Sequence, residues 1–242
     1  MNISSNPLTY RHGETVMKGE FVFDSARSGP RPGVLVVHEA FGLGDRAMAS
    51  ARRLAEAGYA ALAVDLWGNR TQLTEMENVM QTIGGLVADP AAWMGRLDAA
   101  LAALNGQQGV DPSRSAAIGY CFGGASVLEF ARRGAALKGV VSLHGALGPV
   151  GDAWSADTVA ARILMCVGAD DPLIPRDAIT GFQQAADGSG VDYEIDIYGG
   201  TLHSFTNPAA DGPGMPDFAA YNARADRRSW TRTVDFLAEI FA

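Results

Sequence analysis

Three continuous apolar runs constrain the fold of this chain more than any other feature. They read GVLVV at residues 33–37, GVVSL at 139–143 and ILMCV at 163–167. β-branched residues recur in these runs and polar residues hardly interrupt them, which is typical of parallel strands buried on both faces. Segments with helical spacing lie between such runs, for example residues 45–57 before Gly58. This alternation predicts an α/β fold with a mostly parallel central sheet and helices on both faces.

The remaining segments continue the alternation. Further strands are predicted at 20–24, 59–64, 116–118 and 191–198, and the polar arm before residue 20 has room for another. Helices are predicted at 177–186, at 222–241 and, in pieces, within 71–105, with breaks around Gly84–Gly85 and Asp89–Pro90. Residues 111–113 are predicted to form a turn. The last helix is expected to turn Trp230, Val234, Leu237 and Phe241 inward. With no repeat or linker, we expect a single domain over residues 1–242.

Composition excludes several classes of partner. The net charge of −8 argues against nucleic acid and anionic membranes, since both require a basic face. We see no leader pattern in the sequence. Apolar stretches also fall short of the roughly 18 uninterrupted residues that would predict a membrane-spanning helix. The two cysteines form no disulfide framework, which predicts a cytoplasmic location, and no zinc-ligand spacing occurs. We therefore expect neither metal nor cofactor, and a monomer or weak homodimer.

Residues 119–123 form the chemically most informative motif, which reads GYCFG. The frame Gly-x-nucleophile-x-Gly marks a sharp strand-to-helix turn that holds one side chain in a strained, exposed position. Here Cys121 occupies the nucleophile position, after an apolar strand and before a segment able to begin a helix. The alternative is a buried structural cysteine beside a glycine-rich turn.

Other reactive residues follow predicted strands, in the chain order nucleophile, acid, histidine that α/β-hydrolases use. Cys121 comes first, then the adjacent acids Asp170 and Asp171, then His203. A thiol becomes a good nucleophile when a histidine takes its proton and a helix N-terminus stabilises the thiolate. An aspartate holds that histidine in the required tautomer. The backbone N–H groups of Phe122 and Ala40 are predicted to form the oxyanion hole.

Four segments carry a family resemblance: HEAFGL at 38–43, GYCFGGA at 119–125, GADDPLIP at 168–175 and LHSFTNP at 202–208. With them the chain resembles the dienelactone hydrolase family of α/β-hydrolases over roughly residues 15–241. The resemblance implies that Cys121 is the nucleophile, His203 the base and Asp171, rather than Asp170, the acid. It also implies that Glu39 faces the thiol and helps to activate it, with Ala40 as the second oxyanion donor.

One position departs from the family's type enzyme. An arginine that helps to bind the substrate carboxylate lies there four residues after the histidine, where this chain has Asn207. A second family arginine belongs to a segment in which Arg70 and Arg96 cannot be aligned by motif. Asn207 is predicted to bind substrate, and so are Ser204 and Phe41. The substrate class therefore stays broad, and dienelactone itself is in doubt.

Other conspicuous residues have structural interpretations. His38 and His144 follow strands but are interpreted as structural or pocket-wall histidines, since one base suffices. Cys166 lies inside a strand pattern and is expected to be inert core. The predicted function is hydrolysis of a small ester or lactone through a Cys-His-Asp triad and a thioester acyl-enzyme. The alternatives are a ligand-binding protein on a hydrolase fold with little turnover, and a redox role for an exposed thiol.

Overall fold

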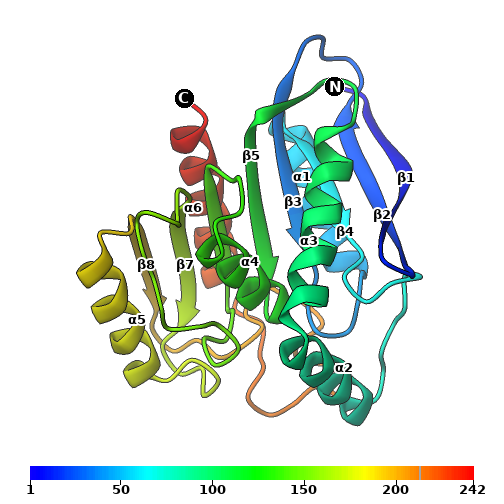
Figure 1. The fold of residues 1–242 in the computed structure, drawn as a ribbon. Coiled ribbons are helices and arrows are strands. Elements are labelled where there is room, and N and C mark those ends of the chain that lie inside the picture. The colour runs from blue at the N-terminus through cyan, green and yellow to red at the C-terminus, as the bar shows by residue number, and fades with distance from the viewer. Residues whose placement is uncertain (213) are drawn as a thin grey trace. The chain divides into compact units, whose positions relative to one another are not determined.

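The computed structural model describes residues 1–212 and 214–242, whose internal packing forms two compact units. The first comprises Met1–Ile118 and the second Gly119–Ala242. In Figure 1 the first unit runs from blue through cyan to green, and the second from green to red. The single domain over residues 1–242 stays a prediction.

The strands of the first unit combine a hairpin with a parallel pair. β1 (Ile3–His12) and β2 (Thr15–Asp24) are antiparallel along their whole length. β2 pairs antiparallel with β4 (Ala60–Val64), and β4 pairs parallel with β3 (Arg31–Val37). The predicted strand at 20–24 therefore begins earlier than expected, because the hairpin extends it back to residue 15. Side chains 34–37 are fully buried, as the apolar run predicts.

Helices cover this first group of strands. α1 (Asp45–Glu56) and α3 (Pro90–Asn105) both pack against β3 and β4, with α3 in front and α1 behind in Figure 1. α2 (Met76–Ala88) precedes α3. The break predicted at Asp89–Pro90 is confirmed, because the Asp89 side chain caps α3 by accepting a hydrogen bond from the N–H of Ala92 at 3.0 Å.

Two local predictions are wrong. Gly84 and Gly85 lie inside α2 and do not break it; a Cβ at either position would meet nothing within 4 Å. The expected turn at 111–113 is part of β5 (Val110–Tyr120). The turn-like signal has a local origin, since the Asp111 carboxylate accepts hydrogen bonds from the N–H and hydroxyl of Ser113 within the extended strand. β5 then carries the chain into the second unit.

The second unit contains three parallel strands in chain order, namely β6 (Gly139–Leu143), β7 (Arg162–Gly168) and β8 (Tyr193–Tyr198). α4 (Phe122–Arg132) and α6 (Ala223–Ile240) both pack on β6, in front of and behind the strands in Figure 1. α5 (Arg176–Ser189) joins β7 to β8. Because the strands are parallel, their carboxyl ends share one edge, which is where ligands of such sheets bind.

The inner face of α6 differs from the predicted one. Of the four residues expected to point inward only Leu237 is buried, and Trp230, Val234 and Phe241 are half-buried. The buried stripe instead contains mostly small residues, which allow the helix to lie close to the strands: Ala225, Ser229, Thr233, Phe236 and Leu237.

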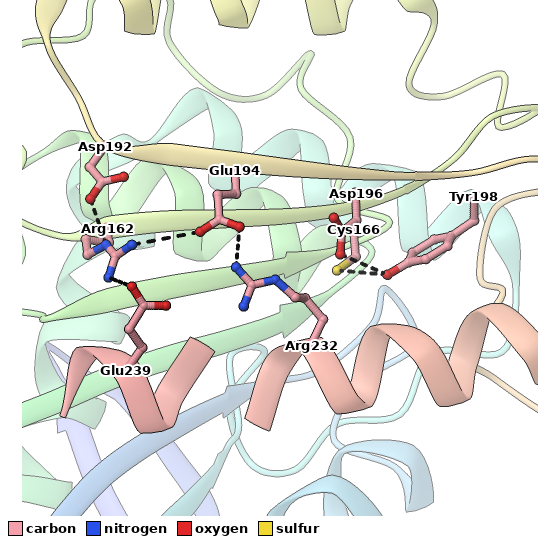
Figure 2. Close-up of polar contacts among 8 residues, drawn as sticks. All are labelled: Arg162, Cys166, Asp192, Glu194, Asp196, Tyr198, Arg232 and Glu239. Carbon is pink, nitrogen blue, oxygen red and sulfur yellow. Dashed lines mark hydrogen bonds and ion pairs between the residues drawn. The ribbon is translucent and has the colours of Figure 1, made fainter. Parts of the chain in front are cut away.

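Charged side chains join β7, β8 and α6, as Figure 2 shows. Arg162 of β7 pairs with Asp192 and with Glu239 of α6, each at 2.7 Å. Arg232 of α6 reaches back to Glu194 of β8. Partly exposed ion pairs of this kind contribute about 0–1 kcal/mol each. The network therefore aligns the helix with the strands more than it stabilises the fold.

Candidate active site

Cys121 lies between β5 and α4 in a backbone conformation that few residues other than glycine adopt. Its φ is 53° and its ψ −118°, and it is the N-cap residue of α4. The glycines around it are required sterically. A Cβ on Gly119 would lie 2.0 Å from the carbonyl oxygen of Gly123, and one on Gly124 would lie 2.8 Å from the Cα of Gly145. The predicted elbow is therefore present, with a half-buried thiol at its apex.

Two other predicted residues lie in line with this thiol. His203, after β8, places Nε2 3.1 Å from Cys121 Sγ. The opposite nitrogen, Nδ1, is 2.7 Å from Oδ2 of Asp171, after β7. His203 and Asp171 are 2% and 3% exposed, so water hardly competes for this contact. Asp170 is exposed, so the side chain that reaches the histidine belongs to the acid that the family motif selects.

The surroundings of His203 favour its protonated form. Burial by itself lowers the pKa of the imidazole. The negative charge of a Cys121 thiolate and the hydrogen bond to Asp171 raise it by more, to about 10 from an ordinary value of 6.5. The arrangement therefore favours a thiolate–imidazolium pair, which is the reactive form of a cysteine nucleophile.

Asp171 is held by its own turn. Its Oδ1 accepts a hydrogen bond from the N–H of Leu173 at 2.9 Å, which leaves Oδ2 directed at His203. With both oxygens engaged, the carboxylate can fix the imidazole tautomer that carries the proton on Nδ1 and presents Nε2 to the thiol. Asp171 therefore sets the orientation of the His203 ring through the nitrogen that faces away from Cys121.

His144 and Thr206 also belong to this cluster; the sequence analysis interpreted His144 as a structural or pocket-wall histidine and gave Thr206 no role. His144 follows β6 and is fully buried, with Nδ1 3.1 Å from the backbone N of Cys121 and Nε2 2.8 Å from Oγ1 of Thr206. Its ring lies edge-on to that of His203, with centroids 5.2 Å apart. The only signal in the sequence was the position of His144 after an apolar strand.

Known proteins resemble this chain in sequence and in fold. The sequence model of the dienelactone hydrolase family matches residues 19–241. The chain belongs to the dienelactone hydrolase family. It is 41% identical to the solved dienelactone hydrolase-like promiscuous phosphotriesterase P91 from metagenomic libraries, over the whole of both chains and with a TM-score of 0.93.

More distant proteins extend the comparison. A curated relative from Methylorubrum extorquens, "Putative carboxymethylenebutenolidase", is 30% identical over 77% of this chain and 70% of its own length. MGS-M1, an α/β hydrolase from a deep-sea metagenome library, is 13% identical with a TM-score of 0.67, covers 99% of this chain and 98% of its own, and shares the fold alone. The α/β-hydrolase fold and the resemblance are thereby confirmed. This member of the dienelactone hydrolase family is a hydrolase.

The other predicted residues of the second unit flank the cluster. Phe122 is the first residue of α4, at the positive end of the helix dipole. Ser204 is buried and has a φ of 53°. Asn207 closes the same loop, since its N–H donates to the carbonyl of Ser204 and its Oδ1 accepts from the N–H of Ala209. Asn207, which stands where the family's type enzyme has an arginine, is therefore part of a turn in this chain.

Glu39, Ala40 and Phe41 belong to the first unit, where they form the turn after β3. The carbonyl of Glu39 accepts from the N–H of Gly42 at 3.3 Å, and that of Ala40 accepts from the indole N–H of Trp67 at 3.1 Å. Glu39 and Phe41 are half-buried, and Ala40 is buried. Their roles toward Cys121 stay predictions.

The two arginines considered for substrate binding have structural partners. Arg70 pairs with Glu20 at 3.1 Å on the surface, and Arg96 donates to the carbonyls of Leu66 and Trp67. His38 is 1% exposed, and its Nε2 accepts from the N–H of Leu66. Burial lowers the pKa of His38 to about 4, so its ring is neutral at pH 7. These contacts shape the loop after β4.

Cys166 occupies a very different place from Cys121. It is fully buried in the middle of β7, and the Tyr198 hydroxyl donates to its sulfur at 3.7 Å (Figure 2). Burial raises the pKa of this thiol to about 12. The prediction that Cys166 is a core residue is confirmed.

Residues 1–212 and 214–242 contain neither a candidate metal-binding cluster nor a membrane-spanning helix. No group of three or more His, Cys, Asp or Glu side chains in that part of the chain could hold a metal ion. Within the same residues, every helix is too short or too polar to cross a membrane.

Proposed function

We propose that this hydrolase cleaves small carboxylic esters or lactones, with Cys121 as nucleophile, His203 as base and Asp171 as the orienting acid. One observation carries the proposal: Cys121 Sγ lies 3.1 Å from His203 Nε2, and His203 Nδ1 lies 2.7 Å from Asp171 Oδ2. The elbow and the helix end at Cys121 add support, because the elbow presents the thiol at the strand end and the helix N-terminus stabilises its thiolate.

In the first half of the reaction, the Cys121 thiolate attacks the carbonyl carbon and forms a C–S bond. The carbonyl electrons move to oxygen, where the N–H groups of Phe122 and Ala40 are proposed to stabilise the negative charge. As the oxyanion collapses, the C–O bond to the leaving group breaks. The departing oxygen takes the proton from His203 Nε2, which leaves a thioester and a neutral imidazole.

In the second half, His203 takes a proton from water while the resulting hydroxide attacks the thioester carbon. The C–S bond then breaks, the carboxylic acid leaves, and the thiolate–imidazolium pair is restored. Glu39 is proposed to assist thiol activation, as the family resemblance implies. Ser204, Asn207 and Phe41 are proposed to contact the substrate around this centre.

The decisive experiment combines pre-steady-state kinetics on p-nitrophenyl acetate with mass spectrometry of the quenched enzyme. We expect a burst of p-nitrophenol and an acetyl group on the peptide that contains Cys121. Cys121→Ala should abolish both, whereas the matched variant Cys166→Ala should keep both, since its sulfur is buried in β7. Full activity in Cys121→Ala would exclude the proposal.

The same assay separates turnover from ligand binding. Lactones that bind to the wild type and to Cys121→Ala with equal affinity, without any product from either, would favour the binding protein instead. Cys121→Ser sharpens the result, because a hydroxyl lacks thiolate character and a site built around an ion pair should then lose most of its rate.

Phosphotriesters are a second proposed substrate class. Support comes from the 41% identity to P91, a dienelactone hydrolase-like promiscuous phosphotriesterase. The thiolate would form an S–P bond while an aryloxide leaves with the proton from His203, and water activated by His203 would then cleave that bond. Paraoxon hydrolysis tests this, and a wild-type rate no higher than that of Cys121→Ala would exclude it.

The setting of the enzyme is also a proposal. We propose a cytoplasmic hydrolase of small molecules that works as a monomer or weak homodimer. Both cysteines are free thiols in the structure, which fits a reducing compartment. Sedimentation at several protein concentrations tests the assembly state, and a stable higher oligomer would contradict it.

A further inference from the structure

The ring of His144 is held on two sides by hydrogen bonds to different segments of the second unit. Nδ1 lies 3.1 Å from the backbone N of Cys121, whose N–H is shared with the carbonyl of Leu143 at 3.0 Å. Nε2 lies 2.8 Å from Oγ1 of Thr206, a fully buried side chain. One imidazole therefore joins the elbow to the loop that carries His203.

These contacts determine the tautomer of His144. A backbone N–H can only donate, so Nδ1 must present its lone pair to Cys121. The ring proton then resides on Nε2 and is donated to the Thr206 hydroxyl. Protonation of Nδ1 would bring two N–H groups face to face and break the contact with the elbow. The bonded form of His144 is therefore neutral.

Backbone strain gathers at the same place. Among the described residues of 119–242, the non-glycine residues with positive φ are Cys121 at 53°, His144 at 41° and Ser204 at 53°. Such conformations persist only where the surroundings hold them, and they cluster at functional sites. His144 contacts the backbone of Cys121 directly. Its ring also lies against His203 and Phe205, on either side of Ser204, with centroids 5.2 and 5.1 Å away.

The charge of His144 matters as much as its shape. The titratable rings of His203 and Tyr120 lie against it, with centroids 5.2 and 6.0 Å away, and its Nδ1 meets the backbone N–H of Cys121. A second cation 5.2 Å from a protonated His203 would oppose the thiolate–imidazolium pair. A neutral ring with both nitrogens engaged holds the site in place without competing for its proton.

We propose that His144 is a positioning residue, which sets the distance between Cys121 Sγ and His203 Nε2 by bracing the elbow against the Thr206 loop. It transfers no proton to substrate. The inference rests on the proposed function, because the distance matters only if Cys121 and His203 react as a pair.

The test uses four variants of the full chain, with the thiol reactivity of Cys121 as the readout. His144→Ala removes both hydrogen bonds. His144→Asn keeps an acceptor for the Cys121 N–H and tolerates positive φ, but loses the link to Thr206. Thr206→Val removes only the acceptor of Nε2–H. Val141→Ala, in the buried middle of β6, is the matched control for lost stability alone.

We expect kcat/KM on an activated ester to fall about 100-fold in His144→Ala and about 10-fold in Thr206→Val and His144→Asn, as misplacement of reacting groups by about 1 Å predicts. The pH midpoint of Cys121 alkylation by iodoacetamide should move upward in the same order. Val141→Ala should unfold more easily with rate and midpoint unchanged. Loss of rate and a raised midpoint in the His144 and Thr206 variants, but not in Val141→Ala, would separate a positioning role from a merely structural one.

Wild-type rates and an unmoved alkylation midpoint in Thr206→Val and His144→Asn would overturn the inference, even if His144→Ala fails to fold. That result is distinguishable from failure of the proposed function. If Cys121→Ala stays active, the proposed function fails; if Cys121→Ala is inactive while the Thr206 and His144 variants behave as wild type, only the positioning role fails.

Discussion

The two cysteines of this chain have the same side chain and opposite surroundings. Cys121 heads α4 in a strained turn, with an imidazole nitrogen 3.1 Å from its sulfur. Cys166 lies in the middle of a regular strand, fully buried, where burial raises the pKa of the thiol to about 12 (Figure 2). Reactivity therefore follows from the strand end and its partners, because residue type alone does not distinguish the two thiols.

Sequence context differs between these positions in a way that explains the structures. Glycines flank Cys121 and remove the Cβ atoms that would collide in the turn. Apolar residues flank Cys166 and continue the strand in both directions. Tyr198 and Asp196 lie beside Cys166, where the tyrosine hydroxyl donates to the sulfur and to the Asp196 carboxylate. We therefore expect substitutions at Cys121 and its partners to change reaction rates strongly, and substitution of Cys166 to change the free energy of unfolding only slightly.

The largest expected effect is selective alkylation. In a short pulse of iodoacetamide at pH 7, Cys121 should react at least about a thousandfold faster than Cys166, whose thiolate is scarce and shielded. Peptide mass spectrometry measures both rates, and the urea-unfolded chain, in which both thiols react, is the control. Equal labelling in the folded protein would remove the basis of the comparison.

The next effect concerns Asp171, which contacts the histidine beside Cys121. Asp171→Asn should lower kcat/KM on an activated ester by roughly 10²–10⁴-fold, because an amide does not hold His203 in the required tautomer. The adjacent, exposed Asp170→Asn is the matched control and should retain the wild-type value. If the two variants lose activity equally, Asp171 has no special role.

A third prediction concerns pH. The His203 pKa is raised to about 10 in the folded protein from 6.5, so its contribution to stability is fully present below pH 6.5 and is lost as pH rises through about 10. The free energy of unfolding of wild type relative to His203→Gln should therefore decline across that window. NMR titration of His203 should also give a lower midpoint in Cys121→Ala, since the thiolate charge is gone.

A wild-type midpoint near 6.5 would contradict the ion pair, whatever the stability data show. His38 is an internal control in the same spectra. Burial lowers its pKa to about 4, so its resonance should not titrate between pH 6 and 10.

The smallest expected effect is at Cys166 itself. Cys166→Ala removes a buried sulfur and should lower the free energy of unfolding by about 1 kcal/mol. Ester hydrolysis should be unchanged. Urea denaturation and steady-state kinetics check the two halves, and a loss of rate with intact folding would show that β7 influences the site more than the comparison allows.

The fold was accessible from sequence where local signals were strong and unopposed. The β3 and β7 runs were predicted within two residues at each end, because continuous burial leaves a continuous apolar pattern. The errors arose where the structural surroundings, which local sequence does not show, outweighed a local sequence pattern. Gly84 and Gly85 were predicted to break α2, yet they lie on its open side, where helix propensity alone is not decisive.

The site shows the same division. Cys121, Asp171 and His203 were predicted because each combines a reactive side chain with a strand end and a motif. His144 was interpreted only as a structural or pocket-wall histidine and Thr206 had no predicted role, because neither residue type reveals a contact with a distant segment. Their contact spans 62 positions of the chain and exists only once β6 and the His203 loop are packed.

Residue order was enough to specify alternating strands and helices, an elbow around Cys121 and a set of reactive side chains at strand ends. These depend on short-range sterics and on burial periodicity, which local sequence encodes. Tertiary structure alone decided that the Cys121 sulfur meets His203, 82 positions away, and that a second histidine contacts the backbone of Cys121. The physical reason is that hydrogen bonds require distances near 3 Å, which only the packed strands and loops can define.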